Sequence, residues 1–147
     1  NHDFCFEQDP VAARSHLTAA TYLEDSGVWI EDLFVWGSPW QPRFFDWAFN
    51  LDRGEALAQK WALIPDHTDI LVTHSPPHGR LDRTSRGQDA GCEALADRVA
   101  QLAPKLHLFG HIHEAYGMER AGGTTFVNAS VCTLRYAPTN APFVIDL

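Results

Sequence analysis

Histidines that follow two predicted buried strands are the residues of this sequence best suited to chemistry. His74 comes directly after the apolar run at 70–72, and His111 and His113 come after a second apolar run. In extended backbone, residues two positions apart point to the same side, so His111 and His113 can face one cavity, and Gly110 can let the chain turn there. Open α/β sheets hold their sites at strand carboxyl ends, so we expect the three histidines to meet.

These side chains are the donors of a transition-metal site. The carboxamide of Asn1 adds an oxygen donor to the histidine nitrogens. Such a set suits Zn, Mn, Fe or Ni better than Ca or Mg, and it accepts all four of those metals. A lone Gly-His-x-His is a weak signal, and its strength here comes from its combination with Asn-His-Asp and Thr-His-Ser-Pro-Pro. The other histidines, for which the sequence favours ordinary polar roles, include His16, His67, His78 and His107.

Two further groups have open interpretations. Arg80, Arg83 and Arg86 follow the turn at 74–79. They form either a solvated loop or a patch that binds the phosphate of a substrate. Aromatic residues gather at 40–49, and they form either a lid over the core or a wall on which a ligand stacks.

The hydrophobic pattern predicts alternating strands and helices followed by a run of strands. Helices are expected at 10–22, 54–63 and 88–103, and strands at 28–33, 34–37, 69–73, 106–109, 124–128, 131–135 and 143–147. This order is typical of a layered α/β sandwich with mixed sheets. The 147 residues contain no internal repeat, so we expect one domain over 1–147.

The composition excludes several classes of protein. A chain that is 45% hydrophobic and 12% aromatic is not a disordered tail. No apolar stretch approaches the ~20 residues of a membrane-spanning helix. The net charge of −8 argues against a protein that coats nucleic acid. Three cysteines without a Cys-x-x-Cys spacing predict buried, reduced thiols in a cytoplasmic protein.

Three motifs together resemble those of the calcineurin-like metallophosphoesterases. They are Asn-His-Asp at 1–3, similar to the tail of the family's Gly-Asn-His-Asp/Glu motif, Thr-His-Ser-Pro-Pro-His-Gly at 73–79, and Gly-His-Ile-His-Glu at 110–114. Further stretches at 36–40, 126–130 and 138–142 resemble the metallophosphoesterase-domain-containing (MPPED-type) phosphodiesterases. The resemblance implies a four-layer αββα sandwich, of which this chain would supply the C-terminal portion.

The resemblance also implies two divalent transition metal ions. Asn1, His74 and His111 would be ligands of one ion, and His113 a ligand of the other. Two metal ions about 4 Å apart can clamp phosphoryl oxygens and generate a hydroxide nucleophile. The substrate would be a small phosphodiester, such as a cyclic or other nucleotide.

The remaining roles follow from the same resemblance. His2 would protonate the leaving oxygen, a task that suits the pKa of histidine near neutrality, and Asp3 would orient it. Arg80, Arg83 and Arg86 are the candidate substrate-binding residues at the rim of the phosphate pocket.

The sequence departs from the family in one large respect. The Asp-x-His and Gly-Asp motifs, which supply the bridging aspartate and most ligands of one metal, do not occur in these residues. Because the sequence opens at Asn1 and its one methionine is Met118, we expect an N-terminal half of the same domain to supply them, and the chain alone to be inactive. The alternatives are a catalytically incomplete module that binds a nucleotide or phosphate, and a fragment completed by another chain. His2 argues against a pure binder, which needs no leaving-group acid.

Overall fold

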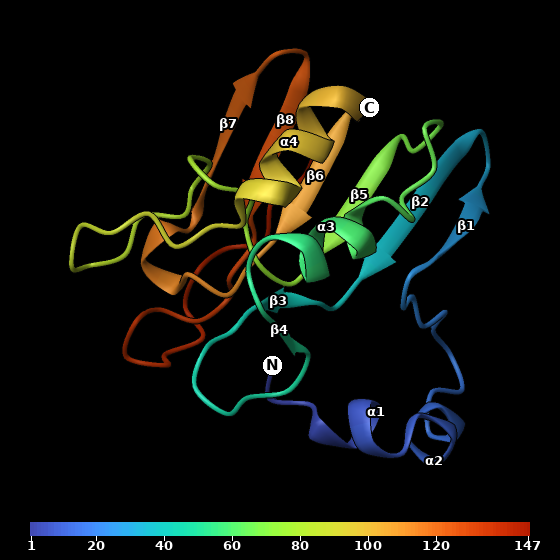
Figure 1. Ribbon diagram of the computed structural model, residues 1–147. Helices are drawn as coiled ribbons and strands as arrows, with labels where there is room; N and C mark the ends of the chain where they lie inside the picture. Colours follow the sequence, from blue (N-terminus) through green and yellow to red (C-terminus); the bar gives the residue numbers. More distant parts are fainter.

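A mixed six-stranded sheet is the centre of the molecule. The computed structural model describes all 147 residues. The strand order is β1-β2-β5-β6-β8-β7, and a separate two-stranded sheet pairs β3 with β4 (Figure 1). The strands are β1 (Ser26–Ile30), β2 (Leu33–Ser38), β3 (Gln41–Pro42), β4 (Asn50–Leu51), β5 (Ile70–Thr73), β6 (Leu106–Phe109), β7 (Gly117–Ala121) and β8 (Thr124–Asn128). The four central strands are parallel and both edge strands are antiparallel, which confirms the expected mixed sheet.

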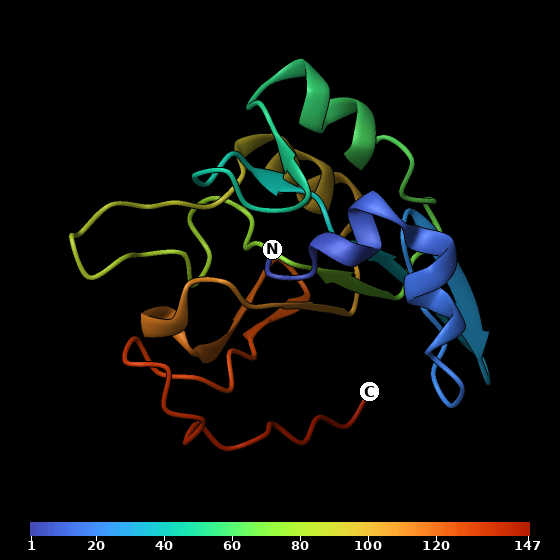
Figure 2. The ribbon, with the colours of Figure 1, turned by 90° about the horizontal axis from the view of Figure 1, so that it is seen from below.

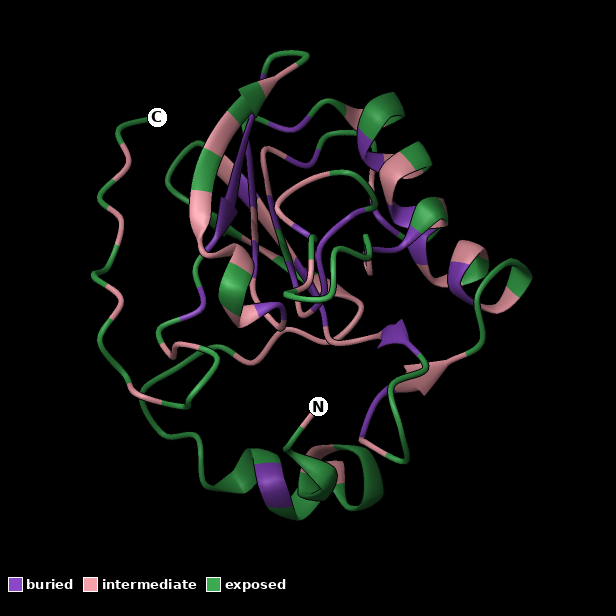
Figure 3. Ribbon diagram, turned by 90° about the vertical axis from the view of Figure 1, so that its left-hand side faces the viewer, coloured by how far each residue is buried: buried purple, intermediate pink, exposed green.

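Two helices cover one face of this sheet. They are α3 (Glu55–Trp61) and α4 (Glu93–Leu102), and they lie side by side over the sheet in Figures 1 and 2. Figure 3 shows that the buried residues of these helices face the sheet while their outer residues are exposed. The core joins both layers through Leu57, Trp61, Leu71, Cys92, Leu95, Val99, Phe109 and Phe126. Each fully buried aliphatic or aromatic side chain of this kind contributes roughly 1.5–3 kcal/mol.

The opposite face of the sheet is apolar and partly open. The strand register places Val35, Ile70 and Leu106 in one row across β2, β5 and β6, away from the helices. On this face Val72 is 36% exposed and Ile30 is 58% exposed. The C-terminal segment runs along this side at some distance below the strands (Figure 2). The chain therefore forms one layer of helices on one six-stranded sheet. The second large sheet that a four-layer αββα sandwich requires is not among these residues.

The N-terminal residues fold differently from the prediction. In place of one helix over 10–22, two short helices form, α1 (Phe4–Gln8) and α2 (Pro10–Ser15). Asp9 accepts a hydrogen bond from the Ala12 amide, and Pro10 occupies the first turn, so a new helix begins there.

The C-terminal strands were predicted in the wrong places. Residues 131–135 and 143–147 form no strand, because the first segment closes into a turn in which Tyr136 N donates to Thr133 O. The structure instead pairs β7 with β8 through Gly122 and Gly123, both at positive φ. Adjacent glycines between strands favour such a hairpin, so Gly122 and Gly123 were the sequence signal that the prediction missed.

The region at 38–53 contains more structure than the predicted loop. β3 and β4 pair within it, and Asp25 anchors its start by accepting from Ser38 Oγ at 2.7 Å and Trp40 Nε1 at 2.8 Å. Lys60 of α3 donates to the same carboxylate at 2.7 Å.

Two simpler findings complete the description. None of the helices is both long and apolar enough to cross a membrane. The three cysteines are free, but only Cys92 is buried, whereas Cys5 is exposed, so the expectation of three buried thiols was wrong.

Candidate metal and phosphate site

His74 and His111 meet because they follow neighbouring parallel strands. β5 ends at Thr73 and β6 ends at Phe109, so both carboxyl ends lie at the same edge of the sheet. A backbone hydrogen bond from Gly110 N to His74 O, at 3.0 Å, ties the two turns together. The imidazole nitrogens His74 Nε2 and His111 Nδ1 lie 3.1 Å apart.

The side chain of Asn1 reaches the same point. Its Nδ2 atom lies 3.4 Å from His111 Nδ1. The Ala48 amide donates to the Asn1 carbonyl at 3.1 Å, which docks the beginning of the chain on the aromatic region. Three residues far apart in the sequence thus converge through three different elements of the fold.

Burial keeps both of these histidines neutral. It lowers the pKa of His74 to about 3 and that of His111 to about 4. Metal ions bind the neutral imidazole, so the protonation state suits coordination at neutral pH.

His113 is oriented by a backbone carbonyl. Its Nδ1 atom lies 3.1 Å from Thr133 O, which can only accept, so Nδ1 carries the hydrogen and Nε2 keeps a free lone pair. Metal-binding histidines are commonly held in this way. His113 begins the 3-10 turn η1 (His113–Ala115), and the ring of Tyr136 lies edge to face against it at 5.3 Å.

The turn after β6 is strained at a histidine. The backbone of His111 has φ 68°, in the left-handed region, whereas Gly110 is not at positive φ. The expectation that Gly110 provides the turn was therefore wrong. A Cβ atom at Gly110 would lie 3.3 Å from Ser130 Oγ, so glycine permits a close approach instead. Left-handed backbone costs a non-glycine residue about 1–2 kcal/mol and is common at functional sites.

His2 lies in the same cavity as Asn1, His111 and His113, whereas His74 does not line this cavity. The cavity, of about 190 Å³, is lined by Asn1, His2, His111 and His113 together with aromatic residues. The ring of His2 packs edge to face on Trp47 at 4.1 Å between ring centroids. Asp3 directly precedes α1, and its exposed carboxylate makes no capping hydrogen bond to that helix.

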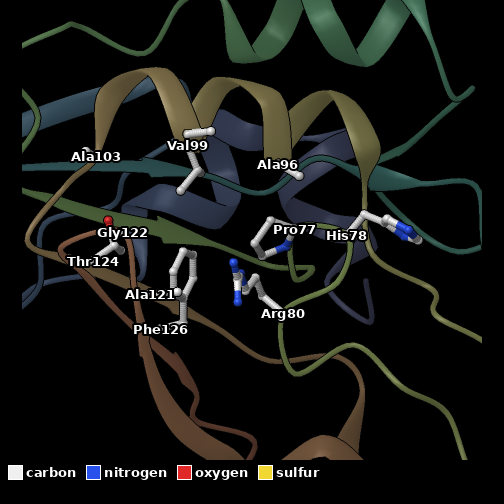
Figure 4. Close-up of a pocket in the computed structure, with 11 residues that line it drawn as sticks. Pro77, His78, Arg80, Ala96, Val99, Ala103, Ala121, Gly122, Thr124 and Phe126 are labelled. Carbon is white, nitrogen blue, oxygen red and sulfur yellow. The ribbon is translucent and has the colours of Figure 1, made fainter.

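The three arginines have separate surroundings. Arg80 lies over the ring of Phe126 at 5.3 Å and 3.3 Å from Glu119, in a cavity of about 260 Å³ between α4 and the β7–β8 hairpin (Figure 4). Arg83 pairs with Asp89 at 3.3 Å, and Arg86 is exposed. The structure brings none of them into the histidine cavity, whose lining from this loop is Thr84. A role in substrate binding stays a prediction.

Asn128 is a site residue that the spacing arguments missed. It is fully buried at the end of β8, and its Nδ2 donates to Leu81 O at 3.1 Å and to Ile112 O at 2.8 Å. Ile112 stands between His111 and His113, so Asn128 fixes the histidine turn. A buried Asn at a predicted strand end was the available signal.

His107 is a second missed residue. It is fully buried, and its Nε2 atom lies 2.9 Å from Thr73 Oγ1. Thr73 Oγ1 donates its hydrogen to Ser75 O at 2.8 Å, so His107 must donate from Nε2. These hydrogen bonds hold the turn that carries His74. His107 thus has the structural polar role that the sequence predicted, and that role supports the site.

The residues fit part of a binuclear metal centre. The side chains of Asn1, His74 and His111 converge, and His113, whose Nε2 keeps a lone pair, lines the cavity that also includes Asn1 and His111. No cluster of three or more His, Cys, Asp or Glu side chains with metal-binding geometry occurs in the chain. The Asp-x-His and Gly-Asp motifs, from which the resemblance implies a bridging carboxylate, do not occur in these residues.

Comparisons with known proteins agree with this geometry. The sequence profile described as calcineurin-like phosphoesterase matches residues 1–115. Metallophosphoesterase domain-containing protein 1 of Homo sapiens is 53% identical over 136 residues, which are 91% of this chain and 42% of the human protein. UPF0046 protein T07D4.2 of Caenorhabditis elegans is 42% identical over 93% of this chain and 35% of its own length. A solved structure of 23% sequence identity shares the fold with a TM-score of 0.57, over 81% of this chain and 50% of its own. The chain thus spans less than half the length of these two curated relatives.

Proposed function

The chain belongs to the calcineurin-like phosphoesterase family, and from that premise we propose that it carries half of the active site of a metal-dependent phosphodiesterase. The single observation that supports this most is the convergence of Asn1, His74 and His111 on one point at a strand edge. Two transition metal ions, when bound, would supply the Lewis acid and the hydroxide nucleophile.

The residues of this chain have distinct tasks in this proposal. Asn1, His74 and His111 hold one ion and His113 the other. A water-derived hydroxide would bond to phosphorus as His2 donates a proton to the leaving oxygen and the phosphorus–oxygen bond to it breaks. The products are a phosphomonoester and an alcohol, which remain in one molecule when the diester is cyclic. The proposed substrate is a small phosphodiester, such as a cyclic or other nucleotide.

The remaining ligands come, in this proposal, from a companion N-terminal half of the same domain. Four-coordinate metal sites need donors that these residues do not supply. A second sheet from that half would also cover the apolar sheet face that includes Ile30 and Val72.

The test is metal-dependent hydrolysis of bis(p-nitrophenyl) phosphate by the full-length protein. We expect His74→Ala and His111→Ala each to lower kcat/KM by more than about 100-fold and to lower the bound metal measured by elemental analysis. His16→Ala is the matched control, because His16 is exposed at the end of α2. Full activity in either ligand variant would contradict the proposal.

A catalytically incomplete phosphate-binding module is the second candidate. The observation that favours it is the absence of a carboxylate from the donor cluster. The same experiment separates the two candidates, because a binding module would bind inorganic phosphate without turnover even when full-length and loaded with metal.

A further inference from the structure

We infer that Phe44 and Tyr136, named here the aromatic rim, stack on an aromatic ring of the substrate, such as a nucleobase. This inference rests on the proposed function and specifies the substrate class of the same site. Both side chains line the cavity that contains His2, His111 and His113.

Each rim residue contacts one of the site histidines. The ring of Phe44 lies edge to face against His111, with 5.0 Å between centroids. The ring of Tyr136 makes the same kind of contact with His113 at 5.3 Å. A group held by the histidines therefore comes within reach of both rings.

Both rim residues are exposed to solvent beside the site. Phe44 is 41% exposed and Tyr136 is 66% exposed, whereas Phe49, from the same region as Phe44, is 4% exposed. The other tyrosines form hydrogen bonds within the protein. Tyr22 donates to Glu24, and Tyr116 donates to Ala141 O. Apolar rings left in water beside a site favour a ligand as their partner.

The backbone around Phe44 is held in place by a specific set of hydrogen bonds. Asn50 Oδ1 accepts from Phe44 N at 3.0 Å, and Asn50 Nδ2 donates to Phe45 O at 2.8 Å. The intervening turn places Phe45 at φ 48°, a left-handed conformation that costs free energy.

The segment that carries Tyr136 is equally constrained. Tyr136 has φ 58°, and its amide donates to Thr133 O at 2.8 Å. The same Thr133 carbonyl faces His113 Nδ1, so the position of the Tyr136 ring is coupled to the orientation of His113. Strain of this kind persists where the surrounding structure imposes it, commonly at ligand clamps.

The cavity has few charged side chains with which to hold a base, so stacking is the interaction that we propose. No Lys or Arg lines it, and its one ionisable carboxylate is Glu114. The chain as a whole has a net charge of −8. Aromatic stacking is indifferent to these charges and binds any base through its π face.

The test is calorimetric binding of AMP and of ribose 5-phosphate to the full-length protein in the presence of Mn²⁺. The two ligands share sugar and phosphate and differ only in the base. We expect AMP to bind about 5- to 100-fold more tightly, the range that stacking one base on aromatic side chains gives. Phe44→Leu and Tyr136→Leu should each weaken AMP binding several-fold. Neither substitution should change the affinity for ribose 5-phosphate.

Two control variants separate stacking from general apolar surface. Phe4→Leu changes a ring that is 38% exposed and does not line the cavity, so AMP binding should not change. Tyr136→Phe keeps the aromatic ring, so AMP should still bind more tightly than ribose 5-phosphate.

The outcomes distinguish this inference from the proposed function. Equal affinity for the two ligands in the wild-type protein, or an equal loss in Phe4→Leu, would overturn the aromatic rim alone. Failure of the wild-type protein to bind ribose 5-phosphate would overturn the phosphate site itself, and the rim with it.

Discussion

A leaving alkoxide needs a proton, and in the proposed mechanism His2 gives it. We expect His2→Ala to slow turnover of an alkyl phosphodiester by roughly 10²- to 10⁴-fold, the usual contribution of general acid catalysis. Bis(p-nitrophenyl) phosphate, whose leaving group needs little protonation, should suffer much less. The measurement is kcat on both substrates with the full-length protein. Equal losses on the two would remove His2 from the role of acid.

His107 makes the stability of the fold sensitive to acid. Burial lowers its pKa to about 3, whereas the unfolded chain has a histidine pKa near 6.5. Below about pH 6.5 the unfolded state therefore binds more protons, and stability falls as pH falls, by about 1.4 kcal/mol per pH unit for each such histidine. His107→Gln should reduce this slope by about that amount between pH 6 and 4.

Urea unfolding at several pH values measures the slope. His16→Gln is the control, because His16 is exposed and should leave the slope as it is in the wild type. An unchanged slope in His107→Gln would mean that the buried ring is protonated in the folded protein.

At the scale of elements, the site depends on β8 as much as on the strands that precede the histidines. Asn128 is held at the end of β8 and bonds the carbonyls of Leu81 and Ile112. We expect Asn128→Asp to cost about 2–4 kcal/mol, because a carboxylate cannot donate to either carbonyl and is itself buried. Metal affinity should fall in the same variant, since Ile112 stands between His111 and His113, the two histidines proposed as ligands.

Denaturant unfolding and metal titration check this prediction. Gln101→Glu makes the same chemical change on the exposed side of α4 and should be nearly neutral. A stable Asn128→Asp protein with normal metal affinity would contradict the role assigned to this amide.

Short apolar runs explain which elements could be predicted from sequence. The strands at 70–73, 106–109 and 124–128 form where such runs end at Pro, Gly or polar residues. The meeting of His74 with His111 follows from adjacent parallel strands. β7 was missed because its sequence, Gly-Met-Glu-Arg-Ala, has little strand preference and is held by pairing with β8.

The roles of Asn128 and His107 depend on neighbours that no local pattern reveals. Asn128 acts on the histidine turn because β8 lies next to β6 in the sheet. His107 supports the turn of His74 because β5 lies on its other side. Strand order of this kind is a property of the whole sheet, and a single sequence carries no local signal for it.

At the scale of the whole molecule, one face of the sheet leaves apolar side chains exposed. Ile30 is 58% exposed and Val72 is 36% exposed on the side opposite α3 and α4. Contiguous exposed apolar surface promotes association, so we expect the 147-residue chain alone to self-associate. Size-exclusion chromatography with light scattering measures this.

Charged substitutions identify the face responsible. Ile30→Lys should shift the chain toward monomer, whereas Val11→Lys, at a residue that is 81% exposed on α2, should not. A monodisperse wild-type monomer would mean that the face is protected by the chain's own residues.

The order of the strands in the sheet also determines when each strand can pair while the chain is being synthesised. From β1 through β2 and β5 to β6, each strand joins the edge left by the strand made before it. A nascent chain can therefore extend its sheet in the direction of translation, at ribosomal rates of about 5–20 residues per second. The exception is β8, which emerges after β7 yet lies between it and β6. Its arrival brings Asn128 to the histidine turn, so the sheet edge that carries the histidines is the last part of this sheet to be completed.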